Sequence, residues 1–322
     1  MAERGSVPLP RPNILVTRVQ YRQTRYCGPG DATNIERLDY GGLMTTIAVC
    51  SVFKDEGPNL LEWIAFHRSL GVDHFFLYDN ESTDGGPLIV KTDPLKNYVT
   101  VIPMPSRPAQ WPAYKHFIDN YASNWDWAAF IDLDEFIHPI EADSIKDLLA
   151  RYEAFSGILL HWFNFGPNGH GRRPDGLVIE NYTSRLPSKH PINRHVKSLV
   201  KTGCLIGEPH PHVTPTTGPK CNSRGEPVST EPIQDGVCHD VMCINHYYTK
   251  SREDWLKKMK RGRVDVLENT MFDSHFTDYA RQCNVIDERI TRFAPRVKAM
   301  LTQARISSSI RPAPSRGVVS SV

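Results

Sequence analysis

The sequence predicts an α/β protein whose first half is a doubly wound, mostly parallel sheet of the nucleotide-binding type. Three observations lead to this prediction. Between residues 45 and 131 apolar runs of strand length alternate with segments of helical period, the links between them are short, and polar residues follow several of the runs. Such an alternation builds right-handed parallel βαβ units. A chain of 322 residues is long enough to bury the core of such a sheet.

The first strand and helix have the clearest patterns. Residues 46–53 (TIAVCSVF) are almost all apolar, which is typical of a parallel strand covered on both faces. Lys54-Asp55-Glu56-Gly57 interrupts the run, Pro58 suits the first turn of a helix, and Gly71 suits a left-handed helix end. We expect three further strands and one more helix in this half, at 74–78, 98–102, 127–131 and, for the helix, 114–123.

The second half of the chain has a less regular pattern. Short β-like runs between 157 and 246 are separated by Pro- and Gly-rich stretches, the longest at 209–232. Loops of that length are commonly functional, and we expect these to form an acceptor-side subsite. A helical period follows at 251–303. The predicted organisation is an N-terminal extension at 1–43, an α/β domain at 44–250, a helical segment packed on it at 251–306 and a flexible tail at 307–322.

Charge and composition exclude several classes of protein. The 38 basic and 36 acidic residues give a net charge of +2, without the concentrated basic excess that nucleic-acid binding requires. No apolar run approaches the ~18 residues of a membrane-spanning helix, and no signal peptide is visible. The seven cysteines are dispersed and odd in number, which favours a reduced compartment. We therefore expect a cytoplasmic protein, or one peripheral at the inner membrane surface.

The most informative stretch is FIDLDEFI at 130–137. Asp132 and Asp134 are two residues apart at the end of an expected strand, so an extended backbone would point both carboxylates to one side. Ligands of open α/β sheets bind beyond the carboxyl ends of the strands. Carboxylate oxygens select Mg²⁺ or Mn²⁺, which would stabilise the charge on a departing nucleoside diphosphate. Alone, however, an Asp-x-Asp pair is usually an ordinary solvated turn.

Other motifs surround this pair in a fixed order: KDE at 54–56, LEWIAFH at 61–67, GVDHFFLYDN at 71–80, WFNFG at 162–166, ENYT at 180–183, KSLV at 197–200 and INHYYTKS at 244–251. Together they resemble the family-92 glycosyltransferases and their bacterial family-2-like relatives, which have the GT-A fold. The resemblance covers roughly residues 45–265. It implies inverting, metal-dependent transfer of a sugar from a UDP-sugar to a glycan acceptor, as in polysaccharide biosynthesis, with galactose as the default sugar.

The resemblance also assigns roles to single residues. It makes Asp132, Asp134 and His246 ligands of Mn²⁺ or Mg²⁺, with Asp132 also at the donor ribose and phosphate. The remaining donor-binding roles, for nucleoside and diphosphate, fall on Asp55, Glu56, Asp79, Lys197 and Lys250. The family more often has Asn before the glutamate, so the match favours Glu56 over Asp55. The catalytic base stays open among four carboxylates, namely Glu135, Asp175, Glu180 and Glu208.

Three alternative functions remain open. A nucleotidyl or phosphoryl transferase would hold its metals on Asp132 and Asp134, although the sequence has no P-loop. A zinc-binding module would draw on the cluster Cys221, Cys238, His239, Cys243 and His246, whose spacing departs from that of zinc knuckles. A non-catalytic carbohydrate-binding module would stack sugars on aromatic side chains, for which the candidates are Trp111, Trp125, Trp127, Trp162 and His170.

Overall fold

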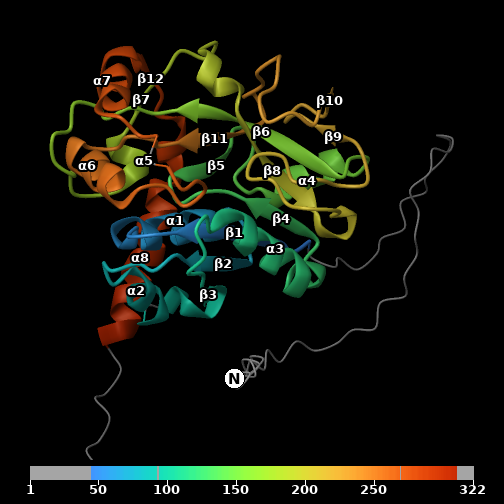
Figure 1. Ribbon diagram of the computed structural model, residues 1–322, viewed down its shortest axis with the longest axis horizontal. Coiled ribbons are helices and arrows are strands. Elements are labelled where there is room, and N and C mark those ends of the chain that lie inside the picture. Colours follow the sequence, from blue (N-terminus) through green and yellow to red (C-terminus); the bar gives the residue numbers. More distant parts are fainter. Residues whose placement is uncertain (1–44, 93, 269, 310–322) are drawn as a thin grey trace, which may run out of the picture. The chain divides into compact units, whose positions relative to one another are not determined.

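The computed structural model describes residues 45–92, 94–268 and 270–309 (Figure 1). Its strands are β1 Ile47–Phe53, β2 His74–Asp79, β3 Val99–Pro103, β4 Trp127–Phe130, β5 Glu135–Pro139, β6 Gly157–Asn164, β7 Ser184–Arg185, β8 Val196–Lys201, β9 Lys220–Cys221, β10 Pro227–Val228, β11 Met242–His246 and β12 Val285–Ile286. Its α-helices are α1 Gly57–Ser69, α2 Gly86–Thr92, α3 Gln110–Asn120, α4 Lys146–Leu149, α5 Val178–Asn181, α6 Arg252–Arg261, α7 Asp273–Gln282 and α8 Ala294–Ser309.

The central sheet confirms the predicted fold class. Its order is β10-β9-β6-β8-β4-β1-β2-β3, with β11 beside β6 and β5 beside β11. Strands β3, β2, β1 and β4 are mutually parallel, which is the doubly wound half that the alternation predicts. Beyond β4 the sheet is mixed, because β8 pairs antiparallel with both β4 and β6 while β6 pairs parallel with β9 and β11.

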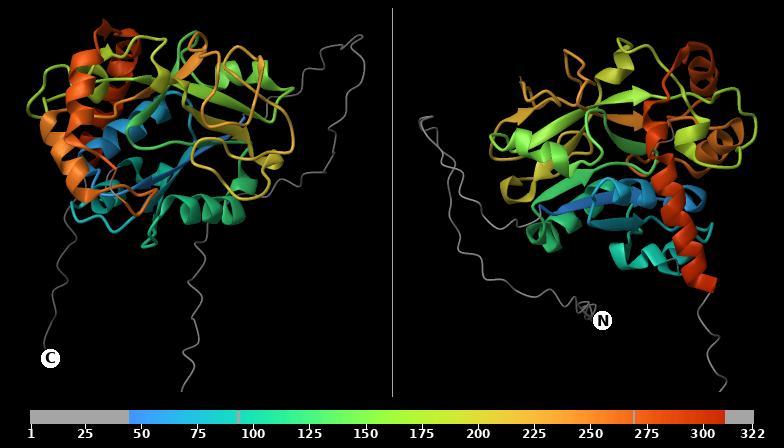
Figure 2. Two further views of the ribbon diagram at one scale, coloured as in Figure 1. Left: turned by 45° about the horizontal axis from the view of Figure 1, so that its top comes forward. Right: turned by 180° about the vertical axis from the view of Figure 1, so that it is seen from behind.

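Strand β1 is buried on both faces, as its apolar run predicts. Side chains alternate across a strand, so Ile47 and Val49 face one core whereas Ala48 and Cys50 face another. Helices α1 and α8 cover the first core and α3 covers the second. Phe293, just before α8, meets α1 with its ring edge-on to Phe66 at 5.8 Å. Figure 2 shows α8 from two further sides.

The glycine at the end of α1 has the predicted conformation. Gly71 has φ +96°, and its N–H donates to the Arg68 carbonyl oxygen at 3.1 Å. An added Cβ would lie 3.0 Å from Ser144 Oγ, so both the dihedral angle and the space favour glycine. The chain then enters β2 after two residues.

The second half is irregular where the composition predicts it. The stretch 209–232 contains only the two-residue strands β9 and β10 in named elements. After β11 the chain is helical in α6, α7 and α8, and the described residues between α6 and α7, 262–268 and 270–272, are non-helical. The proposed extension at 1–43 lies outside the described residues, and so does the proposed tail beyond Ser309, where α8 ends. None of the helices in the described part combines the length and apolarity of a membrane span.

Candidate functional site

A cavity of about 490 Å³ lies beyond the carboxyl ends of β1 and β4. Its wall includes Lys54 and Glu56 after β1, the turn after β4, and single side chains of β6, β8 and β11. Helices α6 and α7, the segment after α6, Gln110 of α3 and the loops at 186–195 and 211–212 also contribute. Ligands of parallel sheets collect at this edge, because the strand ends leave a crevice there. The cavity is therefore where the sequence predicts a binding site.

The two predicted aspartates reach this cavity by a turn and not along a strand. Strand β4 ends at Phe130, and the Glu135 N–H donates to the Asp132 carbonyl oxygen at 3.0 Å, which closes a tight turn into β5. The Glu135 side chain reinforces it, since its Oε2 accepts from the Asp132 N–H at 2.9 Å. The extended backbone assumed from the sequence is wrong at this point. Asp132 and Asp134 still both line the cavity.

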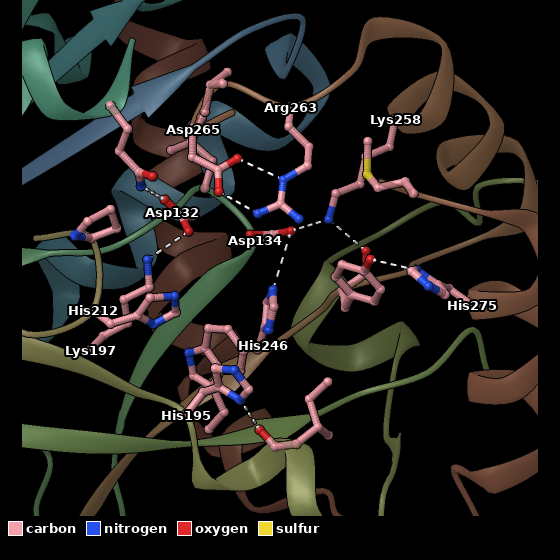
Figure 3. A pocket seen from close by; sticks show the side chains of 18 of the residues that line it. Asp132, Asp134, His195, Lys197, His212, His246, Lys258, Arg263, Asp265 and His275 are labelled. Atoms are coloured by element: carbon pink, nitrogen blue, oxygen red, sulfur yellow. Dashed lines mark hydrogen bonds and ion pairs between the residues drawn. The ribbon is translucent and has the colours of Figure 1, made fainter. Parts of the chain in front are cut away.

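Asp132 is held between an amide and a buried lysine (Figure 3). Gln110 Nε2 donates to its Oδ1 at 2.9 Å, and Lys197 Nζ donates to its Oδ2 at 2.8 Å. The Lys197 side chain is only 2% exposed, and burial alone would lower its pKa. Asp132 and Glu135 reverse the effect and raise the Lys197 pKa above its usual value, so this ammonium is a permanent charge. Asp132 keeps 34% of its side chain exposed toward solvent.

One oxygen atom of Asp134 accepts a hydrogen bond from Lys258 and also faces the His246 imidazole. Lys258 Nζ of α6 lies 2.7 Å from Asp134 Oδ2, and His246 Nε2 of β11 lies 3.6 Å from the same atom (Figure 3). Burial alone would raise the pKa of Asp134, but Lys258 and His246 hold it well below its usual value. Burial lowers the pKa of His246 against the pull of Asp134, so the imidazole is neutral at neutral pH. A neutral imidazole beside an ionised carboxylate can bind a divalent cation.

Glu56 forms the third acidic position of the wall. Arg261 of α6 pairs with its Oε1, and Lys250 Nζ lies 3.8 Å from its Oε2. Burial raises the pKa of Glu56, yet these two cations outweigh it and lower the pKa to about 2. An ionised carboxylate at a strand end can accept hydrogen bonds from ribose hydroxyls or a base. Lys250 does not itself line the cavity and contacts it through Glu56.

The structure does not bring Asp55 and Asp79 into the cavity wall. Asp55 has φ +49°, and its Oδ1 accepts from the Thr83 N–H at 2.6 Å. Asp79 Oδ1 accepts from the Ser82 N–H at 3.0 Å. Both carboxylates therefore fasten the loop after β2 by binding its backbone. Their predicted contact with a nucleoside stays a prediction.

None of the four carboxylates considered as a catalytic base lines the cavity. Glu135 is fully buried behind the turn, where burial raises its pKa well above normal. Glu180 pairs with Lys298 at 2.6 Å, and Asp175 and Glu208 are exposed elsewhere. The carboxylates that do line the wall, beyond the three above, are Asp265 and Asp278. No sequence motif marks them, because they lie in the link after α6 and on α7.

The cavity also contains cations that sequence reasoning missed. Lys258 and Arg261 are one turn apart on α6, and Arg263 follows in the link. Arg263 pairs with both oxygens of Asp265, which lowers the Asp265 pKa although burial opposes it. The spacing of Lys258 and Arg261 on one helical face was the available signal, since i and i+3 residues are neighbours.

The donors in this wall fit a divalent cation by their chemistry. Two carboxylates and one imidazole are a mixed oxygen and nitrogen set, which suits Mn²⁺. Within the described ranges, however, no three Asp, Glu, His or Cys side chains are gathered as closely as a metal ion requires. Lysine ammoniums occupy the carboxylates instead, Lys197 on Asp132 and Lys258 on Asp134. The oxygens are thus already cation-binding, and Asp132, Asp134 and His246 are the residues that would hold a metal.

The structure gives less support to the zinc-binding module and to the non-catalytic carbohydrate-binding module than to an enzyme. Cys238 Sγ lies 3.1 Å from Ser223 Oγ, and His239 Nε2 lies 2.7 Å from the Trp162 carbonyl oxygen, so these two proposed zinc ligands are engaged by other groups. Trp162 lines the cavity, but His195 stacks on its ring at 4.9 Å. Trp111 is 38% exposed and lies outside the lining.

The comparisons with known proteins identify a family. The sequence profile described as glycosyltransferase family 92 matches residues 44–228, more than half of the chain. A family-92 protein of Oryza sativa subsp. japonica is 30% identical over 166 residues, which cover 50% of this chain and 27% of that protein. One from Ricinus communis is 32% identical over 173 residues, covering 49% and 29%. The matched region is thus under a third of these relatives' length.

Solved structures show a distant likeness. S. aureus TarS is 12% identical with a TM-score of 0.37, covering 82% of this chain and 88% of that one. Glucosyl-3-phosphoglycerate synthase from Mycobacterium tuberculosis, in complex with Mn²⁺, UDP and glucosyl-3-phosphoglycerate, is 14% identical with a TM-score of 0.27, covering 49% and 57%. The family itself rests on the sequence match over residues 44–228, which contains Glu56, Asp132, Asp134 and Lys197. The chain belongs to glycosyltransferase family 92.

Proposed function

We propose that this protein is a metal-dependent, inverting glycosyltransferase that moves a hexose, by default galactose, from a UDP-sugar to a glycan acceptor. The observation that carries the proposal is the wall formed by Asp132, Asp134 and His246 in the cavity of a family-92 chain. These residues would hold Mn²⁺ or Mg²⁺, which when bound supplies Lewis-acid stabilisation of the leaving diphosphate.

The charge balance of the cavity supports the need for a divalent ion. Among the described residues, its lining contains five basic side chains, Lys54, Lys197, Lys258, Arg261 and Arg263, and five acidic ones, Glu56, Asp132, Asp134, Asp265 and Asp278. The wall is therefore formally neutral when its histidines are neutral. A sugar nucleotide brings two negative phosphate charges into it, and burying uncompensated charge is costly. A dication restores the balance.

The residues of this chain then have distinct tasks. Glu56 is an acceptor for ribose hydroxyls or the base, and it stays ionised because its pKa is about 2. Lys258, Arg261 and Arg263 are within the wall as donors to phosphate oxygens. Inversion requires a carboxylate to take the acceptor hydroxyl proton as that oxygen attacks the sugar carbon. Asp265 and Asp278 are the candidates, since both line the cavity outside the metal and nucleoside positions.

The test is product analysis with the purified full chain, UDP-galactose, Mn²⁺ and a panel of glycan acceptors. Transfer of the sugar releases UDP. On the same substrate a nucleotidyl transferase would pass UMP to the acceptor and release galactose 1-phosphate, and a transferase of the sugar phosphate would release UMP. Asp132→Asn should lose more activity than the ~10–100-fold that outer-shell partners of a metal cost. The matched control is Asp119→Asn, an exposed helix carboxylate paired with Lys115, which should be unchanged. Full activity in excess chelator would contradict the metal.

His246 and the base have separate tests. His246→Ala should raise the Mn²⁺ concentration needed for half-maximal activity, and the pH dependence of that concentration should weaken, because a neutral imidazole is required for binding. An unmoved activation curve with a lowered melting temperature would make His246 a packing residue. Asp265→Asn and Asp278→Asn should separate the base from its neighbour: the base variant keeps UDP binding and loses transfer.

A further inference from the structure

Lys258 makes the closest contact to Asp134 in the cavity wall. Its Nζ donates to Asp134 Oδ2 at 2.7 Å and to the Tyr248 carbonyl oxygen at 2.9 Å, and it lies 4.4 Å from the centre of the Tyr248 ring. Its side chain is 15% exposed and that of Asp134 is 10% exposed. The ammonium is therefore ordered by three partners and is largely removed from water.

The oxygen that Lys258 occupies is the oxygen that His246 also faces. His246 Nε2 is 3.6 Å from Asp134 Oδ2, so a metal ion bound through this oxygen and His246 would lie directly beside the Lys258 ammonium. Metal–oxygen distances for Mg²⁺ are about 2.0–2.1 Å, and an ammonium cannot stay hydrogen-bonded to the same buried atom beside a dication without strong repulsion. Binding of the metal and the present position of Lys258 exclude each other.

A displaced Lys258 has a new partner only when phosphate is present. Arg261 follows Lys258 by one helical turn, and both side chains line the same cavity. If the Lys258 ammonium leaves Asp134, it therefore stays in the cavity close to the positive charges of Arg261 and Arg263. Without an anion this arrangement is repulsive. With a diphosphate in the cavity, Lys258 can donate to a phosphate oxygen in place of the carboxylate. Four rotatable side-chain bonds permit the move without a shift of α6.

We propose that Lys258 is an exchangeable internal cation: it neutralises Asp134 while the cavity is empty, and transfers to the donor diphosphate when a divalent ion takes Asp134. The proposal rests on the proposed function for the identity of the anion and of the metal. It requires that metal and nucleoside diphosphate bind cooperatively, since each removes a cost of binding the other. By linkage the coupling is the same whichever ligand is added first.

The experiment measures Mn²⁺ binding to the full chain without any turnover, from the electron paramagnetic resonance signal of free Mn²⁺, with and without UDP. Lys258→Met removes the competing charge, and Lys258→Gln keeps a hydrogen bond to Asp134 while removing the charge. Both should bind Mn²⁺ alone about tenfold more tightly than the wild type, which is about 1.4 kcal/mol. UDP should tighten Mn²⁺ binding to the wild type by more than to either variant.

The control is the neighbouring Lys257→Met on the same helix. Lys257 is 67% exposed and pairs with Glu253 at 2.7 Å, so its loss changes the net charge equally without touching the cavity. It should leave both Mn²⁺ affinity and the effect of UDP unchanged. Equal tightening in Lys257→Met and Lys258→Met would reduce the result to a general charge effect and overturn the proposal.

Two further outcomes are decisive, and they separate this proposal from the proposed function. Saturable Mn²⁺ binding that UDP does not strengthen in the wild type overturns the exchange while leaving a metal-dependent enzyme, and this measurement needs no folded variant. No saturable Mn²⁺ binding in the wild type with UDP, nor in the folded Lys258 variants, overturns both. Unfolded samples are recognised beforehand by circular dichroism.

Discussion

Replacing Asp134 by alanine takes away the carboxylate that compensates Lys258, and we expect the variant to lose stability as well as metal. Removing one partner of a buried ion pair costs about 3–5 kcal/mol, because the other charge is left uncompensated. Two features of the structure reduce this value. Lys258 keeps the Tyr248 carbonyl oxygen at 2.9 Å, and burial already lowers the Lys258 pKa, so the amine can shed its proton. We therefore expect a loss of about 2–3 kcal/mol.

Urea and thermal unfolding measure this loss. For a domain of this size, 1 kcal/mol shifts the melting temperature by about 2 °C, so Asp134→Ala should melt about 4–6 °C lower. Although burial alone would raise the pKa of Asp134, Lys258 and His246 hold it well below the unfolded value. A carboxylate with a depressed folded pKa stabilises above the unfolded pKa and loses that effect as pH falls. The gap between wild type and variant should therefore narrow below about pH 4.

A double-mutant cycle identifies the cause. If the loss comes from an unpaired ammonium, the double variant Asp134→Ala with Lys258→Met should recover at least half of it, giving a coupling energy of about 1–2 kcal/mol. The Lys257→Met change in the same background is the control, since Lys257 is exposed. Additive losses, with a coupling below about 0.5 kcal/mol, would refute the reasoning that Asp134 and Lys258 form an energetically significant pair.

Three further predictions concern stability. Burial raises the pKa of Glu62 to about 7, although the backbone N–H groups of Val178 and Ile179 donate to its carboxylate. In urea unfolding, the wild type should therefore lose stability relative to Glu62→Gln as pH rises from about 5 to 7. A difference in unfolding free energy that stays constant over this pH range would contradict the prediction. Arg261 and Lys250 outweigh the effect of burial and lower the pKa of Glu56 to about 2. In the same assay, Glu56→Gln should therefore lose more unfolding free energy at pH 7 than at pH 3. An equal loss at both pH values would exclude the ion pairs of Glu56 as its cause. Gly157→Ala would place a Cβ 2.6 Å from Val200 Cγ1 and should lower the free energy of unfolding by about 1–3 kcal/mol. The control Gly203→Ala, which has open space around it, should lower it far less. Equal melting temperatures of the two variants would show that the strand shifts to accommodate the added methyl group.

The parallel half of the fold was predictable because each element there has one local pattern. The apolar run of β1 and the Gly57-Pro58 start of α1 are readable within a few residues, and short links leave few ways to connect them. The helix α2 was not predicted, since seven residues with two exposed apolar side chains, Leu88 and Ile89, give no clear amphipathic period.

The candidate site was likewise predictable only where its signal in the sequence is local. Asp132 and Asp134 were found because their signal is local, a carboxylate pair after a strand. The turn that presents them was not, since it depends on the buried Glu135 side chain accepting from the Asp132 N–H. Lys258 lies 124 residues from Asp134 in the sequence, and only the path from β11 into α6 brings the two together. The nucleoside-binding role of Asp55 and Asp79 came from the family resemblance and stays a prediction, and no local pattern reveals that loop N–H groups donate to both carboxylates.

The ion pairs in the cavity wall join the two halves of the chain. Asp132 pairs with Lys197 of β8, Asp134 with Lys258 of α6, and Glu56 with Arg261 of the same helix. In each pair the acid follows a strand of the parallel half, whereas the base belongs to an element of the second half. An anionic ligand that binds these lysine and arginine side chains therefore also weakens the ion pairs that hold α6 over the sheet edge. A cation that binds the carboxylates weakens the same ion pairs. In the proposed reaction, metal and diphosphate together would replace both partners of each broken pair, so the wall would keep its charge balance only when the two ligands bind jointly.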